Sequence, residues 1–334
     1  MRGDSARGLQ GISAFVTAVE AGSFTVAAER LGLTKSAVGK SIARLEERLG
    51  VRLLERTTRS LKCTEAGGAF YRTCIAVLSE LDDAQARLEA HRGSVSGRLR
   101  VSLPVSFGRR WVLPVLLELG RANQALQLEI FFTDRQVDLI EEGFDLVVRL
   151  GEPAENLGLS ARFLGMQKWI VCAAPSYLER HGTPHSYDQL AEHECLVITS
   201  GNRPVSWQLV DAKGNRTSIK VAGRHSISSG DATLDAAVAG MGIACMPTWL
   251  MCDQLRSGRL VRLLSPEAAE YSPIYALWPH ARDLLPRIRT SVDMLIARFL
   301  PKAPWDLACL TAYATTDITH FSASYQHSKV TRHD

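Results

Sequence analysis

The stretch that decides the fold reads SFTVAAERLGLTKSAVGKSI over residues 23–42. Ser23 suits the N-cap of a short helix over Phe24–Leu31, because its hydroxyl can accept a hydrogen bond from a free backbone N–H. Gly32 should end that helix, since glycine tolerates a positive φ. Thr34 is a second N-cap candidate, from which another helix begins. The pattern predicts two helices joined by a tight turn.

These two helices have the residues that a helix-turn-helix needs. Ala28 is small enough to let two crossing helices approach, and it lies four residues before Gly32. The second helix can then present a polar, basic face to the major groove of DNA. A three-helix subdomain without special purpose is the alternative, but the basic free face favours DNA binding. The shared core of the two helices is expected to contain Leu31, Leu33, Val38 and Ile42, and Leu45 and Leu49 fall on the same face of the second helix as Val38 and Ile42.

The flanking sequence extends this unit in both directions. Apolar residues at three- and four-residue steps from Leu9 to Val19 predict a preceding helix, which Gly22 ends. Two β-prone segments, 51–54 and 60–63, enclose a polar loop at 55–59. Thr64 then caps a long helix that runs to about residue 91.

This long helix has a heptad seam, which we interpret as a dimer contact that holds two recognition helices one turn of DNA apart. Packing of the helix on its own domain is the alternative. Gln85 in the seam would fix the register at some cost in stability. The dimerisation candidates are Tyr71, Cys74, Leu78, Leu81 and Leu88.

Beyond a polar hinge at 92–97, strands alternate with helices. The first set has strands at 98–103, 126–132 and 145–150 and helices at 109–120 and 135–142. The second set has strands at 168–173, 195–199, 219–221, 243–246 and 274–278 and helices at 231–239 and 284–299. Repeated strand–helix–strand units predict an α/β domain with a mostly parallel sheet. Residues 301–334 lack a sustained period, so we expect a mostly disordered tail.

Charge and cysteine content narrow the class of protein. The whole net charge of +4 lies in residues 1–65, which carry eleven Lys/Arg against seven Asp/Glu. Such an excess at one end is expected if only that end meets a polyanion. No apolar run suits a membrane span and residues 1–10 do not resemble a signal peptide, so we expect a cytoplasmic protein. Seven scattered cysteines without a CxxC pair should be reduced, mostly packed thiols.

Five runs carry a family resemblance. They are FVTAVEAGSF (15–24), AAERLGLTKSAV (27–38), IARLEERLG (42–50), LLERTTR (53–59) and LKCTEAG (61–67). Together they resemble the LysR-type transcriptional regulators of bacteria, and the resemblance extends over residues 8–300. It implies an N-terminal all-α winged helix-turn-helix and a C-terminal α/β domain of two lobes, similar to periplasmic solute-binding proteins.

The resemblance also implies domain boundaries. The winged helix-turn-helix would occupy residues 8–65, the dimerising linker helix 66–91 and the hinge 92–97. The effector-binding domain would occupy 98–300, with lobe I at about 98–167 and 271–300 and lobe II at about 168–270. A tail over 301–334 would follow.

Chemistry and the family match together give candidate DNA contacts. The first turn of the third helix offers backbone N–H groups and the positive end of the helix dipole to a phosphate or a base edge. Gly39 departs from the family, which usually has serine there, so one hydroxyl contact is lost. A solvated surface charge is the alternative for each basic residue. The candidates are Thr34, Lys35, Ser36, Gly39, Lys40, Arg44, Arg56 and Arg59.

In an α/β sheet a ligand lies beyond the carboxyl ends of the strands, often against a helix N-terminus. Candidate effector contacts at such positions are Ser102, Ser106, Phe107, Arg149, Gly151, Ser229 and Asp231. Ser106 and Asp231 could instead be simple N-caps, and Arg149 a surface ion-pair partner. Arg149 together with helix N-termini favours a small anionic effector.

Catalytic motifs are missing from the sequence: it has no GxGxxG, Walker loop, HExxH or GxSxG, so we expect no enzyme and no cofactor. His181, His185, His193 and Cys195 have no familiar zinc spacing, so no metal is expected. The expected partners are double-stranded promoter DNA, a small-molecule effector, further copies of this chain in a homodimer or homotetramer, and RNA polymerase.

The main prediction is therefore a sequence-specific DNA-binding transcription regulator that responds to an effector. The alternative is a small-molecule-binding or transferase protein of periplasmic-binding fold with an accessory helical domain. A third hypothesis is an architectural DNA binder with an unliganded C-terminal half.

Overall fold

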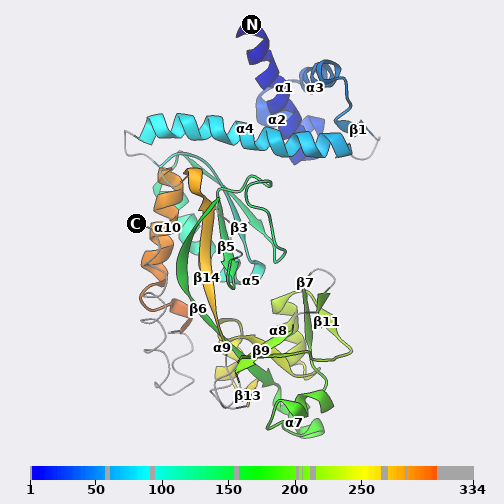
Figure 1. Ribbon diagram of the computed structural model, residues 1–334, viewed down its shortest axis with the longest axis vertical. Coiled ribbons are helices and arrows are strands. Elements are labelled where there is room, and N and C mark those ends of the chain that lie inside the picture. The colour runs from blue at the N-terminus through cyan, green and yellow to red at the C-terminus, as the bar shows by residue number, and fades with distance from the viewer. Residues whose placement is uncertain are drawn as a thin grey trace.

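A small helical domain is joined through one long helix to an α/β domain of two lobes in the computed structural model (Figure 1). The long helix α4 (Glu65–Ala90) lies between the two domains. The structure describes residues 2–56, 61–90, 95–153, 158–200, 203–204, 206–210, 216–264, 270–282 and 285–306. Within those ranges, no helix is long and apolar enough to cross a membrane.

Three helices form the body of the helical domain: α1 (Arg2–Ala21), α2 (Phe24–Leu31) and α3 (Lys35–Leu49). Both predicted N-caps are confirmed, because Ser23 Oγ accepts from the backbone N–H of Thr25 and Thr34 Oγ1 from that of Ala37. Gly32 ends α2 at φ +63°, in the left-handed region that favours glycine. The predicted helix-turn-helix is therefore confirmed.

The core of this domain contains Phe15 from α1, Ala28 from α2, and Val38, Ile42 and Leu45 from α3, all nearly inaccessible to solvent. One prediction is wrong. Leu33 is 50% exposed, because it lies in the turn before α3 begins and no second helix covers it. Leu49 is 40% exposed, because it ends α3 beyond the packed part of the helix.

Two short strands follow, β1 (Leu54–Arg56) and β2 (Leu61–Cys63), and they pair antiparallel. The predicted strand at 51–54 is therefore shifted, because the observed strand β1 begins at Leu54, the last residue of the predicted range. Thr64 is the N-cap of α4 as predicted, since its Oγ1 accepts from the backbone N–H of Gly67 at 2.9 Å. Phe15 of α1 packs against Phe70 and Tyr71 of α4, which seats the long helix on the helical domain.

In the described part of the chain, a seven-stranded sheet connects both lobes in the order β12-β6-β14-β5-β3-β4, with β13 also on β6. Its strands are β3 (Gly97–Leu103), β4 (Leu126–Phe132), β5 (Leu146–Leu150), β6 (Leu159–Ala173), β12 (Ala244–Pro247), β13 (Val261–Leu263) and β14 (Glu270–Pro279). The prediction of a mostly parallel sheet is wrong, because within this described sheet β3–β4 and β3–β5 pair in parallel and the other four pairings are antiparallel. The long strands β6 and β14 run antiparallel to each other from one lobe into the other (Figure 1).

Helices cover one face of the sheet in lobe I: α5 (Val105–Phe107), the π-helical turn η1 (Gly108–Val112), α6 (Leu113–Ala122) and α10 (Pro286–Phe299). The predicted helix at 135–142 is wrong, because turns occupy this segment. Asp138 Oδ1 accepts from the backbone N–H groups of Ile140 and Glu141, and Arg135 pairs with Glu142. These local side-chain bonds replace those of a helix.

Lobe II has a small sheet of β7 (Val197–Ser200), β8 (Arg203–Pro204) and β11 (Ser226–Ile227) and a hairpin of β9 (Trp207–Val210) and β10 (Arg216–Ile219). The strand predicted at 219–221 is wrong in extent, because β10 ends at Ile219. The helices of this lobe are α7 (Pro175–His181), η2 (Asp188–Glu192), α8 (Gly230–Val238) and α9 (Thr248–Arg256).

The end of the described chain corrects the predicted tail. Trp305 is fully buried, its indole N–H donates to the carbonyl of Met166 at 2.8 Å, and its ring packs against Phe107, Trp111 and Phe299. The prediction that the chain is mostly disordered from residue 301 onward is therefore wrong for residues 301–306, because the buried Trp305 side chain holds this segment against the domain. Residues 307–334 lie outside the described residues.

The cysteines are mostly packed, as expected. Cys172 and Cys195 are fully buried, and burial raises the pKa of each thiol to about 12. Cys252 is joined in a disulfide bond, so the expectation that all cysteines are reduced is wrong for this residue.

Candidate DNA interface and candidate effector site

Helix α3 is divided lengthwise between buried and exposed residues. Val38, Ile42 and Leu45 pack into the helical core. The predicted contacts Lys35, Ser36, Lys40 and Arg44 are all exposed. The helix therefore presents a hydroxyl and three cations on a free face, which suits a phosphate backbone and base edges.

The start of α3 is organised by its cap. Thr34 Oγ1 accepts from the backbone N–H of Ala37 at 3.2 Å, so this hydroxyl serves the helix itself. Gly39 is half-buried, and a Cβ added there would meet no atom within 4 Å. There is therefore room for a side chain at position 39, and packing does not require glycine there.

The wing is positioned by a contact that the sequence reasoning missed. Glu46 Oε1 in α3 accepts from the backbone N–H groups of Leu53 and Leu54, at 2.8 and 3.1 Å. This carboxylate fixes the start of β1 against the recognition helix. Arg56 is the last residue of β1, and the structure describes its backbone but not its side chain. Arg59 lies outside the described residues.

The predicted seam on α4 divides into two parts. Cys74 is only 2% exposed, and Tyr71 and Leu78 pack against the same helical core. For Cys74, the interpretation as a dimer contact is wrong, because its side chain is already covered within its own chain. Leu81 is 45% exposed and Val77, outside the predicted seam, is 41% exposed. Leu88 lies in α4, and its side chain is not described.

Two predicted effector contacts meet at the carboxyl ends of β3 and β5. Arg149 Nη2 donates to Ser102 Oγ at 3.1 Å, and Arg149 Nη1 donates to the carbonyl of Val148 at 2.8 Å. Burial lowers the pKa of Arg149 to about 10, against the opposing effect of Asp134 and Glu142. The side chain is half-buried, and the oxygens to which it donates in the described part of the chain, Ser102 Oγ and the Val148 carbonyl, are neutral, which is an arrangement that favours an added anion.

A second pair joins the two lobes. Ser106 Oγ in α5 donates to Asp231 Oδ2 in α8 at 2.7 Å. Ser229 Oγ is the N-cap of α8, because it accepts from the backbone N–H of Ala232. The structure thus brings Ser106 and Asp231 together although they are 125 residues apart.

The remaining predicted contacts differ in position. Phe107 is fully buried among Trp249, Phe299 and Trp305, which places its side chain in the core. Gly151 follows β5 at φ +98°, and its backbone N–H donates to Pro273.

The sequence reasoning missed Asp134, which follows β4. Its Oδ1 accepts from the backbone N–H of Val105 at 3.0 Å, at the start of α5. Sequence alone gave no sign of this contact, because it depends on the pairing of β4 with β3. The charges that act on Arg149 come from the carboxylates of Asp134 and Glu142 and from the guanidinium of Arg135.

The histidine-rich segment of lobe II packs around Tyr177. The ring of His181 stacks on the Tyr177 ring at 4.6 Å, and His193 Nδ1 lies 3.2 Å from the Tyr177 hydroxyl. Cys195 is buried and its thiol donates to the carbonyl of Leu190. Among the described residues, no three His, Cys, Asp or Glu side chains gather as metal ligands would.

Two family models match the chain. The model described as "LysR substrate binding domain" matches residues 92–300, and the one described as "Bacterial regulatory helix-turn-helix protein, lysR family" matches residues 9–68. Among relatives, the HTH-type transcriptional regulator CrgA of Neisseria meningitidis serogroup C is 33% identical over 286 residues, 85% of this chain and 95% of CrgA. DmlR of Escherichia coli K12 is 34% identical over 298 residues, 89% of this chain and 96% of DmlR.

Solved structures of full-length proteins are similar as well. CrgA of Neisseria meningitidis, described as a LysR-type transcriptional regulator, matches with a TM-score of 0.55 and 32% identity, over 86% of this chain and 97% of that chain. The virulence activator AphB of Vibrio cholerae matches with a TM-score of 0.59 and 28% identity, over 86% and 98%.

Proposed function

The chain belongs to the LysR family of bacterial transcriptional regulators, and we propose that it binds promoter DNA as a homodimer or homotetramer controlled by a small anionic effector. It has both parts of such a regulator, a helix-turn-helix DNA-binding domain and an effector-binding domain. We place its action in the cytoplasm, where promoter DNA is, and propose RNA polymerase as a further partner and no enzymatic activity.

The exposed basic face of α3 is the observation that carries the DNA-binding proposal. Lys35, Lys40 and Arg44 are exposed while the opposite face of the helix is buried. This division frees the helix to enter a major groove, and the free N–H groups of its first turn suit a phosphate. Lys40 is the residue proposed to read a base. The wing arginines, Arg56 and Arg59, stay predicted phosphate contacts.

The proposed dimer surface is the part of α4 that does not pack against the helical domain of its own chain. Val77 and Leu81 are exposed there, four residues apart, and Leu88 follows seven residues after Leu81. This spacing is that of a heptad seam, and exposed aliphatic side chains at such positions favour a second helix. Two helix-turn-helix units held in this way could reach successive major grooves on one face of DNA.

The effector site is proposed around Ser102, Arg149, Ser106 and Asp231. Arg149 supplies a half-buried positive charge, for which the partner that fits is an anion. The ionised carboxylates of Asp134 and Asp231 can only accept hydrogen bonds, so a ligand that contacts them must also carry hydrogen-bond donors. The effector class is thus a small anion that also carries hydroxyl or ammonium groups. A ligand beside the Ser106–Asp231 hydrogen bond could compete for it and so change how the two lobes contact each other.

Footprinting on the promoter beside the gene tests the DNA-binding proposal at residue level. Lys40→Ala should weaken specific binding by about 1–3 kcal/mol if Lys40 reads a base. Arg121→Ala, which removes an exposed cation from the end of α6, is the matched control and should leave affinity unchanged. An equal loss of affinity for random DNA would mean that Lys40 contacts a phosphate and not a base. Unchanged affinity for both DNAs would mean that Lys40 does not contact DNA.

A further inference from the structure

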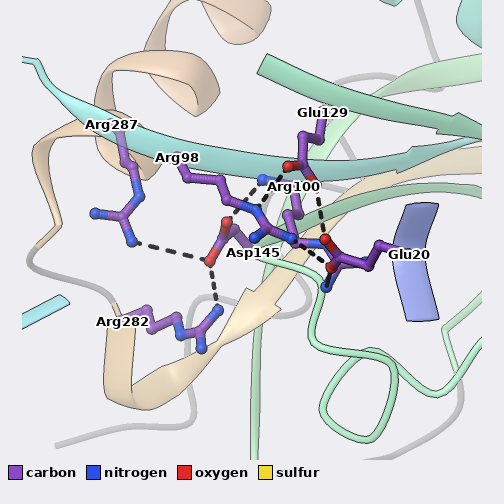
Figure 2. A network of polar contacts seen from close by, with 7 residues as sticks. All are labelled: Glu20, Arg98, Arg100, Glu129, Asp145, Arg282 and Arg287. Atoms are coloured by element: carbon purple, nitrogen blue, oxygen red, sulfur yellow. Dashed lines mark hydrogen bonds and ion pairs between the residues drawn. The ribbon is translucent and has the colours of Figure 1, made fainter. Parts of the chain in front are cut away.

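An ion-pair cluster joins the DNA-binding domain to the regulatory domain across 78 residues of sequence (Figure 2). Glu20 lies in the last turn of α1, and its Oε1 is 3.1 Å from Arg98 Nη2 and 4.0 Å from Arg100 Nη1, both on β3. Glu129 on the neighbouring strand β4 completes the cluster, 2.8 Å from Arg98 Nε and 3.4 Å from Arg100 Nε. Two arginines thus face two carboxylates, one of them from the other domain.

Arg100 is the more enclosed of the two arginines, with 8% of its surface exposed. Its guanidinium lies over the rings of Phe131 and Phe144, at 5.3 and 5.7 Å from their centroids. The same arginine lines a cavity of about 330 Å³ between α4 and lobe I. Arg100 faces two carboxylates of this chain at ion-pair distance, although its Nε and Nη1 make no hydrogen bond within the described residues.

A close packing contact lies beside the charges. Ile75 of α4 is 6% exposed, and a Cβ on Gly143 would come within 2.3 Å of Ile75 Cγ2. Gly143 also has φ +68°, so glycine is required there on two counts. The helical domain therefore fits lobe I through an apolar contact as well as through the ion pairs.

Strand β3 links this contact to the candidate effector site. Arg98, Arg100 and Ser102 alternate along β3 and so share one face of the sheet. Arg100 is also bonded twice to Asp145, the residue before β5: its backbone N–H donates to Asp145 Oδ2 at 2.7 Å, and its carbonyl accepts from the backbone N–H of Asp145 at 2.8 Å. Arg149, further along β5, donates to Ser102. The paired strands β3 and β5 therefore carry residues of both the interdomain ion-pair cluster and the candidate effector site.

Asp145 is itself anchored from the other end of the chain. It is 2% exposed, pairs with Arg282, and has Arg287 Nη2 at 4.0 Å from its Oδ1 (Figure 2). This buried carboxylate ties the start of β5 to β3 and to the C-terminal part of the chain, and closely packed interiors of this kind transmit strain.

We propose that Glu20, Arg98, Arg100 and Glu129 form a latch that fixes the orientation of the DNA-binding domain on lobe I, and that β3 and β5 couple this latch to the effector site. The coupling rests on the proposed function of Arg149 as the anion contact. Single exposed ion pairs contribute little, whereas a partly buried cluster with packing beside it holds one orientation and still opens when its charges are disturbed.

Domain orientation in the full-length protein without DNA tests the latch. Spin labels at Leu49 in α3 and Arg121 in α6, introduced as unnatural amino acids, report the interdomain distance by pulsed EPR, with labelled chains diluted so that one copy per oligomer is labelled. Glu20→Gln removes the interdomain charge. Glu118→Gln is the matched control, because Glu118 pairs with Arg298 at 2.6 Å entirely within the regulatory domain.

The latch predicts that Glu20→Gln broadens and shifts the distance distribution at low salt, that high salt shifts the wild type in the same way, and that Glu118→Gln leaves it unchanged. Identical distributions for wild type and Glu20→Gln at low salt would overturn the latch. Arg149→Gln removes the charge that a bound anion would neutralise, so it should shift the wild-type distribution and add nothing in the Glu20→Gln background. No shift from Arg149→Gln would overturn the coupling.

These readouts are separate from the proposed function. Because the distances are measured without DNA, a failure of operator binding leaves the latch result intact. Conversely, an unchanged distance distribution with intact operator binding would reject the latch alone.

Discussion

Ser106 Oγ in lobe I donates a 2.7 Å hydrogen bond to Asp231 Oδ2 in lobe II. The bond joins the first turn after β3 to the first turn of α8, and both ends lie where an effector is proposed to bind. Any ligand that separates or tightens these two residues changes how the lobes meet, so this bond is a direct measure of lobe closure.

A double-mutant cycle on this pair should detect its energy. Ser106→Ala, Asp231→Ala and the double variant should show a coupling of about 0.5–1.5 kcal/mol in the free energy of unfolding, as expected for one hydrogen bond that is partly exposed to water. Chemical unfolding of the full-length protein measures it. Additive effects of the two substitutions would mean that the lobes do not meet in this way in solution.

Gly39→Ser should stabilise α3 by about 0.5 kcal/mol, because glycine is unfavourable inside a helix and the site has room for a side chain. Amide exchange within α3 is the measurement, and slower exchange is expected. Gly39→Ala is the control for DNA recognition, since it stabilises the helix without adding a hydroxyl. Only the serine variant should alter sequence preference, and a loss of helix stability in both variants would refute the open space at this position.

Trp305→Ala should lower the free energy of unfolding by about 3–5 kcal/mol, since it removes a fully buried aromatic ring and a hydrogen bond to Met166. Thermal and denaturant unfolding would report the loss. Lys302→Ala, three residues earlier and exposed, should change stability by no more than about 0.5 kcal/mol. Equal small effects would show that the segment beyond α10 does not pack.

Asp306 should make stability depend on pH. Burial raises the pKa of this carboxyl to about 6, with Lys168 opposing the shift. The folded chain therefore binds a proton more tightly than the unfolded chain, so this contribution to stability is full below about pH 4 and is lost as the pH rises through about 6. Unfolding of wild type and Asp306→Asn across this range should show that the variant lacks the decline. Parallel pH profiles would contradict the buried carboxyl.

The helix-turn-helix could be predicted because its determinants are local. Ser23 and Thr34 each cap a helix through a hydrogen bond to a residue two or three positions away, and Gly32 sets the turn by its own φ. Leu33 was predicted wrongly because an apolar residue in a turn has no periodic pattern to show which way it faces.

The α/β domain was harder to predict, because its arrangement depends on distant pairings. Residues of β6 meet β14 about a hundred positions later, and no local pattern reveals that they run antiparallel. Trp305 is a single aromatic residue outside any periodic run, so its burial was invisible in sequence. The same applies to the site: Arg149 was found from its place at the end of a strand, whereas Asp134 and Glu46 act through contacts that only the fold creates.

Binding to the promoter beside its own gene, measured by fluorescence anisotropy over a series of salt concentrations against random DNA of equal length, decides whether this chain is a promoter-specific regulator. A promoter-specific regulator should bind the promoter with sub-micromolar affinity, much more tightly than random DNA, and log affinity should fall linearly as log salt rises because phosphate contacts release counterions. Equal affinity for the promoter and random DNA at every salt concentration would contradict this prediction.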